Sequence, residues 1–173
     1  RKSTRRNKAI NVEPRVKHGG VAGIRLTRSA KLNARNDSRI WAIRDRFEKM
    51  PEGVRAAVID GEGDHFCAGF DLSELKERDA GQGLHHSRMW HAALERVQYG
   101  PVPVIAASHG AVAGGGLELA SARPTRVADE ATFHAFPART RGIVVGAGVP
   151  VPTPRRTGRP RSALIATPRA PPR

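Results

Sequence analysis

Three consecutive glycines, Gly114 to Gly116, constrain this chain more than any other feature. An apolar, strand-like run, Pro103 to Ala107, leads into them, and the residues after them read as a helix. A backbone without side chains is open to close approach by another group. The first N–H groups of a helix lack intrahelical partners and can hold a negative charge or an oxyanion. Glu118 lies within a turn of these glycines, which places an ionisable group beside them. The alternative is a glycine turn that only lets a strand and a helix pack closely.

A second stretch repeats this arrangement. Residues 54–60 read as an apolar, partly β-branched strand, and a glycine-rich segment from Gly61 to Leu75 follows it. The order strand, glycine-rich loop, helix therefore occurs twice, about one βαβ unit apart. This repetition predicts an α/β layered fold.

Together the two stretches resemble the crotonase superfamily, the enoyl-CoA hydratase/isomerase family. The matching pieces are Phe66–Leu72, and Pro103–Ala107 followed by Gly110–Ala120, with Gly142–Gly148 as a weaker third piece. Two ordered motifs at this separation are far more specific than either alone. The resemblance implies an α/β fold, a crotonase-like ββα spiral core, in a chain that lacks the usual C-terminal helices. It also implies assembly as a homotrimer or hexamer.

The resemblance further implies a site that stabilises the enolate of a coenzyme A thioester. The stabilising groups would be the backbone N–H groups of Phe70 and Gly115, with Glu118 as acid and base. Coenzyme A would enter as part of the acyl-CoA substrate, and no separate cofactor or metal is expected. Substrate contacts would come from Arg28, Lys31, Leu32, Ala34, Ala68, Gly69, Asp71, Leu72 and Gly114. For Arg28 and Lys31, which would meet the phosphates of coenzyme A, solvated loop charges are the alternative.

Two positions depart from the family pattern. Ala138 stands where hydratases carry their second catalytic glutamate, so water addition would rely on Glu118 alone. Gly146 stands where the dehalogenating branch carries its aspartate nucleophile, which gives that branch no support. Isomerisation by a single base stays possible, and a non-catalytic remnant that binds coenzyme A is the alternative function.

The charge distribution divides the chain into three parts. The net charge of +14 consists of +6 in residues 1–20, zero in residues 21–138 and +8 in residues 139–173. We therefore predict a basic, disordered segment (1–19), a crotonase-like core (20–148) and an irregular Pro/Arg-rich tail (149–173). That tail would be either a native basic tail or the product of a shifted reading frame. Nucleic-acid binding by the basic ends is a third, less favoured function.

The remaining sequence predicts packing elements. Helices are expected over residues 36–50, capped by Asp37 or Ser38, and over residues 85–97, with a loop at 78–84 before the second. His85, His86 and His91 lack an acid at ligand spacing, so they do not predict a metal site. Cys67, the one cysteine, is expected as a small buried residue in a reducing, cytoplasmic setting. No apolar run predicts a membrane span or a signal peptide.

Overall fold

The computed structural model describes residues 19–74, 79–122 and 125–136. A four-stranded parallel sheet has the order β1 (Val21–Leu26), β2 (Ala56–Gly61), β3 (Val104–Ser108) and β5 (Thr125–Ala128). A smaller parallel pair joins β4 (Ala111–Ala113) to β6 (Phe133–Ala135). The helices are α1 (Asp37–Glu48), α2 (Ala80–Tyr99) and α3 (Gly115–Ser121), with single 3-10 turns at η1 (Ser29–Lys31) and η2 (Leu72–Glu74).

The main sheet brings three loops to one edge. Its strands are parallel throughout, with Ile24 opposite Ile59 and Ile59 opposite Ala106. The carboxyl ends of parallel strands lie at the same edge of a sheet, which is where α/β proteins place their ligands. The segments that come after β1, β2 and β3 therefore meet there, and they contain most of the predicted site residues.

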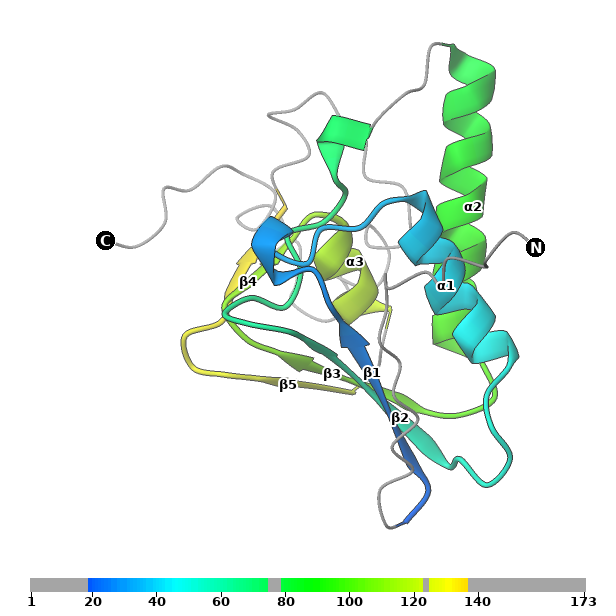
Figure 1. The fold of residues 1–173 in the computed structure, drawn as a ribbon, viewed down its shortest axis with the longest axis vertical. Helices are drawn as coiled ribbons and strands as arrows, with labels where there is room; N and C mark the ends of the chain where they lie inside the picture. The colour runs from blue at the N-terminus through cyan, green and yellow to red at the C-terminus, as the bar shows by residue number, and fades with distance from the viewer. Residues whose placement is uncertain (1–18, 75–78, 123–124, 137–173) are drawn as a thin grey trace, which may run out of the picture.

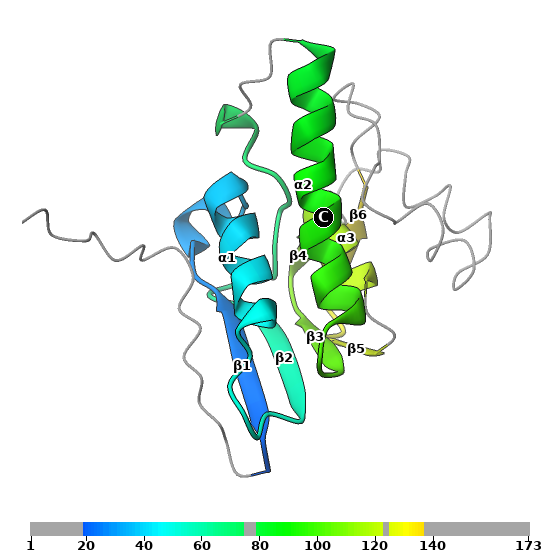
Figure 2. The ribbon, with the colours of Figure 1, turned by 90° about the vertical axis from the view of Figure 1, so that its right-hand side faces the viewer.

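Helices α1 and α2 lie side by side on one face of the main sheet, as Figures 1 and 2 show. Apolar residues recur at helical spacing on both helices and are buried in one core with the strands. The buried positions include Ile40, Ile43 and Phe47 on α1 and Trp90, Leu94 and Val97 on α2. Both helices lie where the sequence predicts them, at residues 36–50 and 85–97.

Two helix boundaries differ from prediction. The N-cap of α1 is Asn36, whose side chain accepts a hydrogen bond from the Arg39 N–H at 3.2 Å, so the predicted caps at Asp37 and Ser38 are wrong. Helix α2 begins at Ala80, within the predicted loop. The Asp79 side chain caps it by accepting the Gln82 N–H at 2.8 Å, and this bond offsets the poor helix propensity of the nearby glycines.

In the part of the chain that the structure describes, no helix is long and apolar enough to cross a membrane.

Candidate active site

The segment Cys67–Asp71 runs between two others at the carboxyl edge of the sheet. On one side, the Cys67 N–H donates to Ala111 O at 3.1 Å, and the Ala113 N–H donates to Cys67 O at 2.9 Å. On the other side, the Arg35 N–H donates to Gly69 O at 2.7 Å, and the Asp71 N–H donates to Arg35 O at 2.8 Å. Backbone from three separate parts of the chain is thereby fixed in one layer.

This pairing decides where the Phe70 N–H points. In a parallel bridge, the residue opposite Arg35 turns its own N–H and C=O away from Arg35. Phe70 is that residue, so its N–H faces the side on which Cys67 meets Ala111. Within residues 19–74, 79–122 and 125–136, the Phe70 N–H makes no hydrogen bond.

Glycine at two positions lets the segment before Phe70 touch the start of α3. Gly69 has φ +103°, and a Cβ there would lie 2.9 Å from Ala113 O and 3.0 Å from the Gly115 nitrogen. A Cβ on Gly116 would clash with Cys67 O. Only bare backbone fits at either contact. The Gly115 N–H begins α3 and, among the described residues, is likewise without a hydrogen-bond partner.

Glu118 places a carboxylate beside Gly115. It lies one turn further along α3, and helical side chains lean back over the preceding turn. Its Oε2 lies 3.6 Å from the point where a Gly115 Cβ would stand, and the residue is 9% exposed. The structure therefore brings together Phe70, Gly115 and Glu118, the three residues expected to be catalytic.

Arg35 is a site residue that the sequence pattern missed. It is 1% exposed, and its Nη2 donates to the carbonyl oxygen of Gly115. Its guanidinium lies over the Trp90 ring at 5.0 Å from the centroid, while Nε and Nη1 have no hydrogen-bond partner among the described residues. A buried cation therefore stands next to Gly115, whose N–H has no partner among the described residues. Its position between Ala34 and the cap of a helix gave no sign that the side chain turns inward.

Two aromatic side chains of α2, His86 and Trp90, contact the Phe70 ring. The Phe70 ring centroid lies 5.0 Å from that of His86 and 5.3 Å from that of Trp90. The Trp90 indole nitrogen is 2.8 Å from His86 Nε2. His86 Nε2 is also 2.8 Å from Asp37 Oδ1. An unprotonated Nε2 accepts from Trp90, and a protonated one donates to Asp37. His91, one turn further along α2, has its Nδ1 2.7 Å from the Ser87 carbonyl oxygen on its own helix.

The predicted contacts for coenzyme A lie around η1, the turn after β1. Leu32 is 46% exposed, and its carbonyl oxygen accepts the Ala68 N–H at 2.9 Å, whereas Ala34 is buried. Lys31 is exposed at the end of the turn. Arg28 instead points its Nη1 at Asp71, 2.7 Å from Oδ2.

Asn33 connects this turn to the loop after β2, a role that the sequence analysis did not assign. Its side-chain amide donates to Glu62 O at 2.8 Å and to His65 O at 2.7 Å. Its Oδ1 accepts the Arg28 N–H at 2.8 Å. Because Asn33 is 1% exposed, these bonds are shielded from water and hold the two loops together.

Asp71 follows Phe70 and fixes the next turn. Its Oδ1 accepts the Ser73 hydroxyl at 2.6 Å and the Ser73 N–H at 3.2 Å. The Ser73 hydroxyl bond is the main reason that the pKa of Asp71 lies below its ordinary value. The backbone bond and the charges of Lys31 and Arg28 lower this pKa further, against burial, which raises it. The carboxylate is therefore ionised at neutral pH and anchors the η2 turn.

The other predicted site residues lie on the same layer. Ala68, Gly69 and Leu72 belong to the segment around Phe70, and Gly114, whose N–H donates to Ala135 O at 3.0 Å, precedes α3. Cys67 is buried, with its thiol 3.3 Å from Asn33 O. Across the described ranges, no three His, Cys, Asp or Glu side chains gather as metal ligands would. Ala138 and Gly146 lie outside the described residues.

A hollow of about 370 Å³ between α1 and α2 lies apart from this site. It is lined by Arg44, Glu48, Ala92, Glu95, Arg96 and Tyr99. Glu48 pairs there with Arg44 at 2.8 Å and with Arg96 at 3.4 Å. None of the residues around Phe70 and Gly115 lines it, so it has no part in the site.

Comparison with known proteins agrees with this architecture. A model of the family enoyl-CoA hydratase/isomerase matches residues 16–167. The crystal structure of enoyl-CoA hydratase from Thermoplasma volcanium GSS1 superposes with a TM-score of 0.82 and 33% identity, over 91% of this chain and 63% of that one. A structure from Rhodopseudomonas palustris CGA009, assigned provisionally as an enoyl-CoA hydratase, is 48% identical, with a TM-score of 0.84 over 91% of this chain and 60% of that one.

Known protein sequences also resemble this chain. Enoyl-CoA hydratase domain-containing protein 2, mitochondrial, of Bos taurus is 33% identical over 143 residues, which are 80% of this chain and 48% of that protein. The chain spans about half the length of the curated relatives it matches.

The parallel sheet, the two meeting glycine loops and these matches define the α/β fold of the crotonase superfamily. Within it, the chain belongs to the enoyl-CoA hydratase/isomerase family.

Proposed function

We propose that the chain acts on acyl-CoA thioesters, with the Phe70 and Gly115 N–H groups binding the thioester oxygen and Glu118 moving a proton. The observation that carries this proposal is a pair of N–H groups on adjoining segments that have no partner among the described residues and lie next to a shielded carboxylate. Free donors held by the fold need no reorganisation when negative charge develops on an oxygen between them.

Each group has a definite task in this reaction. When the α-proton of a thioester leaves, charge moves to the carbonyl oxygen and an enolate forms. One positioned donor to such an oxygen is typically worth about 3 kcal/mol of transition-state stabilisation. The Glu118 carboxylate accepts the proton and returns it, which is general acid–base catalysis. Lys31, exposed at the end of η1, would meet the phosphates of the coenzyme A moiety, whereas Arg28 pairs with Asp71.

Ala138 favours single-carboxylate chemistry over water addition. A hydratase needs a second acid or base to handle the water, and this chain has an alanine at the matching position. Proton removal and return at one face of the substrate needs only Glu118. We therefore propose α-proton exchange and double-bond isomerisation as the reaction type. The full activities of the relatives belong to chains about twice as long.

Replacement of Glu118 tests the assignment. We expect Glu118→Gln to lower the rate of α-proton exchange between an acyl-CoA and D2O by about 100-fold or more, since the amide is no base. Proton NMR follows the exchange directly and needs no second substrate. Acyl-CoA affinity, measured by calorimetry, should change little. Glu62→Gln, on the exposed end of the loop after β2, is the matched control and should exchange at the parent rate.

Equal exchange rates for Glu118→Gln and the parent would contradict the role of Glu118. A parent chain that binds acyl-CoA but catalyses no exchange would instead be a non-catalytic coenzyme A-binding protein, the alternative that Ala138 also suggests.

A further inference from the structure

Arg35 touches both halves of the candidate site. Its main chain brackets Phe70, because its N–H binds Gly69 O at 2.7 Å and its carbonyl accepts the Asp71 N–H at 2.8 Å. Its side chain reaches across to Gly115, where Nη2 donates to the carbonyl oxygen. One residue therefore holds the peptide units on either side of Phe70 and, 80 positions further along the chain, the first residue of α3.

The Arg35 guanidinium is also a buried charge without a full set of partners. The residue is 1% exposed, Nε and Nη1 are unpartnered among the described residues, and the guanidinium carbon lies over the Trp90 ring. A buried cation is costly for folding, and an apolar side chain of similar size would often be as stable or more stable there. Proteins keep a buried charge with unpaired N–H groups mainly at functional sites.

The charge stands beside Gly115, one of the two residues whose N–H groups are proposed to bind the thioester oxygen. A Cβ on Gly115 would lie 3.0 Å from Arg35 Nη2 and 3.6 Å from Glu118 Oε2, so both groups border the same residue whose N–H is free. In a site shielded from water, a fixed positive charge stabilises a developing oxyanion more strongly than in solution.

We propose that Arg35 is a positioning residue, which holds the Phe70 and Gly115 N–H groups in register and keeps a buried positive charge beside the thioester oxygen. This inference rests on the proposed function. It differs from a purely structural role, in which Arg35 would only tie two loops together, because it requires polarisation of a bound thioester carbonyl.

A chromophoric thioester measures that polarisation without turnover. The probe is the coenzyme A ester of 4-(dimethylamino)cinnamic acid, whose absorption moves to longer wavelength when donors pull electrons toward its carbonyl oxygen. The whole 173-residue chain is used. The first variant, Arg35→Leu, removes both the planar guanidinium and its charge. The second, Arg35→Lys, keeps the charge but loses the planar set of N–H donors.

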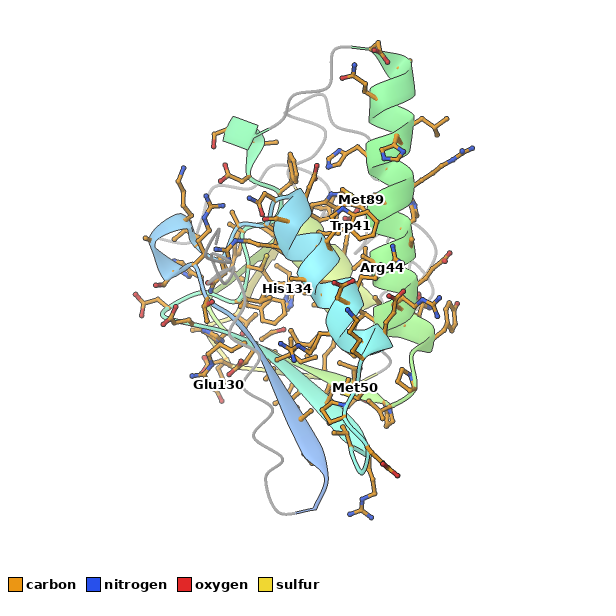
Figure 3. All side chains as sticks on the ribbon, turned by 45° about the vertical axis from the view of Figure 1, so that its right-hand side comes forward. Trp41, Arg44, Met50, Met89, Glu130 and His134 are labelled. Atoms are coloured by element: carbon orange, nitrogen blue, oxygen red, sulfur yellow. The ribbon has the colours of Figure 1, made fainter. Side chains whose placement is uncertain are left out.

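Arg44→Leu is the matched control. Arg44 also lies over a tryptophan, with its guanidinium 4.7 Å from the Trp41 centroid, but it pairs with Glu48. Figure 3 labels Trp41 and Arg44 on α1, and Arg44 lines the hollow between α1 and α2 rather than the site.

We expect the parent and Arg44→Leu to bind the probe with the same red shift. Arg35→Leu should bind it with an affinity within about threefold, yet lose most of the red shift and about 10- to 100-fold of the α-proton exchange rate. Arg35→Lys should give an intermediate shift. If Arg35→Leu fails to fold, the lysine variant decides: an intermediate shift supports the proposal, and the full parental shift overturns it.

Two other results separate this inference from the proposed function. A full parental red shift in a folded Arg35→Leu would overturn the role of Arg35 alone. A parent chain that binds the probe without any shift would overturn the proposed function, and this inference with it.

Discussion

Single backbone positions decide whether the two glycine-containing loops can meet. A Cβ on Gly116 would clash with Cys67 O and would lie 2.8 Å from Cys67 Cβ. Glycine leaves room for both atoms. Both neighbours are at the backbone and cannot swing away as a long side chain would. The contact between Cys67 and Gly116 is therefore a condition for the Phe70 and Gly115 N–H groups to lie on one layer.

This contact predicts opposite effects of the same substitution at two glycines. Gly116→Ala should lower the free energy of unfolding by about 2–3 kcal/mol, because the added methyl group forces the backbone apart. Gly83→Ala, on α2 with open space around the new Cβ, should raise it by up to about 1 kcal/mol through helix propensity. Urea unfolding of both variants and the parent measures the difference. A Gly116→Ala variant as stable as Gly83→Ala would contradict the close approach.

At the residue scale, Phe70, Gly115 and Glu118 lie near one another, as the family resemblance implied, because the glycine contacts and the spacing along α3 fix their placement. Their catalytic roles stay predictions. Arg35 and His86 could not be identified in this way. Their side chains enter the site through tertiary packing against Trp90, which no local pattern shows.

At the scale of elements, the turn that comes after Phe70 depends on one carboxylate. Asp71 is 6% exposed, accepts two hydrogen bonds from Ser73 and pairs with Arg28 next to the turn after β1. It thereby connects η2 to η1. Because the pKa of Asp71 is lowered in the folded chain, the ionised form stabilises the fold.

The sign of this shift gives a pH dependence. The stabilisation is complete above the ordinary pKa of 3.8 and is lost as the pH falls through the lower pKa of the folded chain. Asp71→Asn should therefore be less stable than the parent at pH 7, and the difference should shrink below pH 3.8. Ser73→Ala, which removes the largest cause of the shift, should show part of the same effect. Urea unfolding across this range tests it, and a pH-independent difference would contradict it.

Most elements could be predicted because their patterns are local. The strands at β2 and β3 follow from apolar runs, and helix α1 follows from its periodicity. The start of α2 could not, since Gly81 and Gly83 are typical of a loop, whereas the Asp79 side chain caps a helix there. The pairing of β4 with β6 is tertiary and had no sequence signal.

At the scale of the whole molecule, the described part is a nearly neutral core, and the excess positive charge lies mainly toward the ends of the sequence. The predicted character of residues 1–18 and 137–173, including Ala138, lies outside the described residues. A cytoplasmic setting, trimeric or hexameric assembly and the domain boundaries stay predictions. The loops around Phe70 and Gly115, which belong to this core, are proposed to form a thioester site.

Residue-resolved amide hydrogen exchange tests that claim most directly. Phe70 and Gly115 have free N–H groups in the described structure, so both amides should exchange fast without ligand. An acyl-CoA should slow exchange at Phe70 and Gly115 in particular, because its carbonyl oxygen accepts both. Free coenzyme A, which has no thioester carbonyl, should leave them fast. Equal, fast exchange at both amides with and without acyl-CoA would contradict the existence of the site.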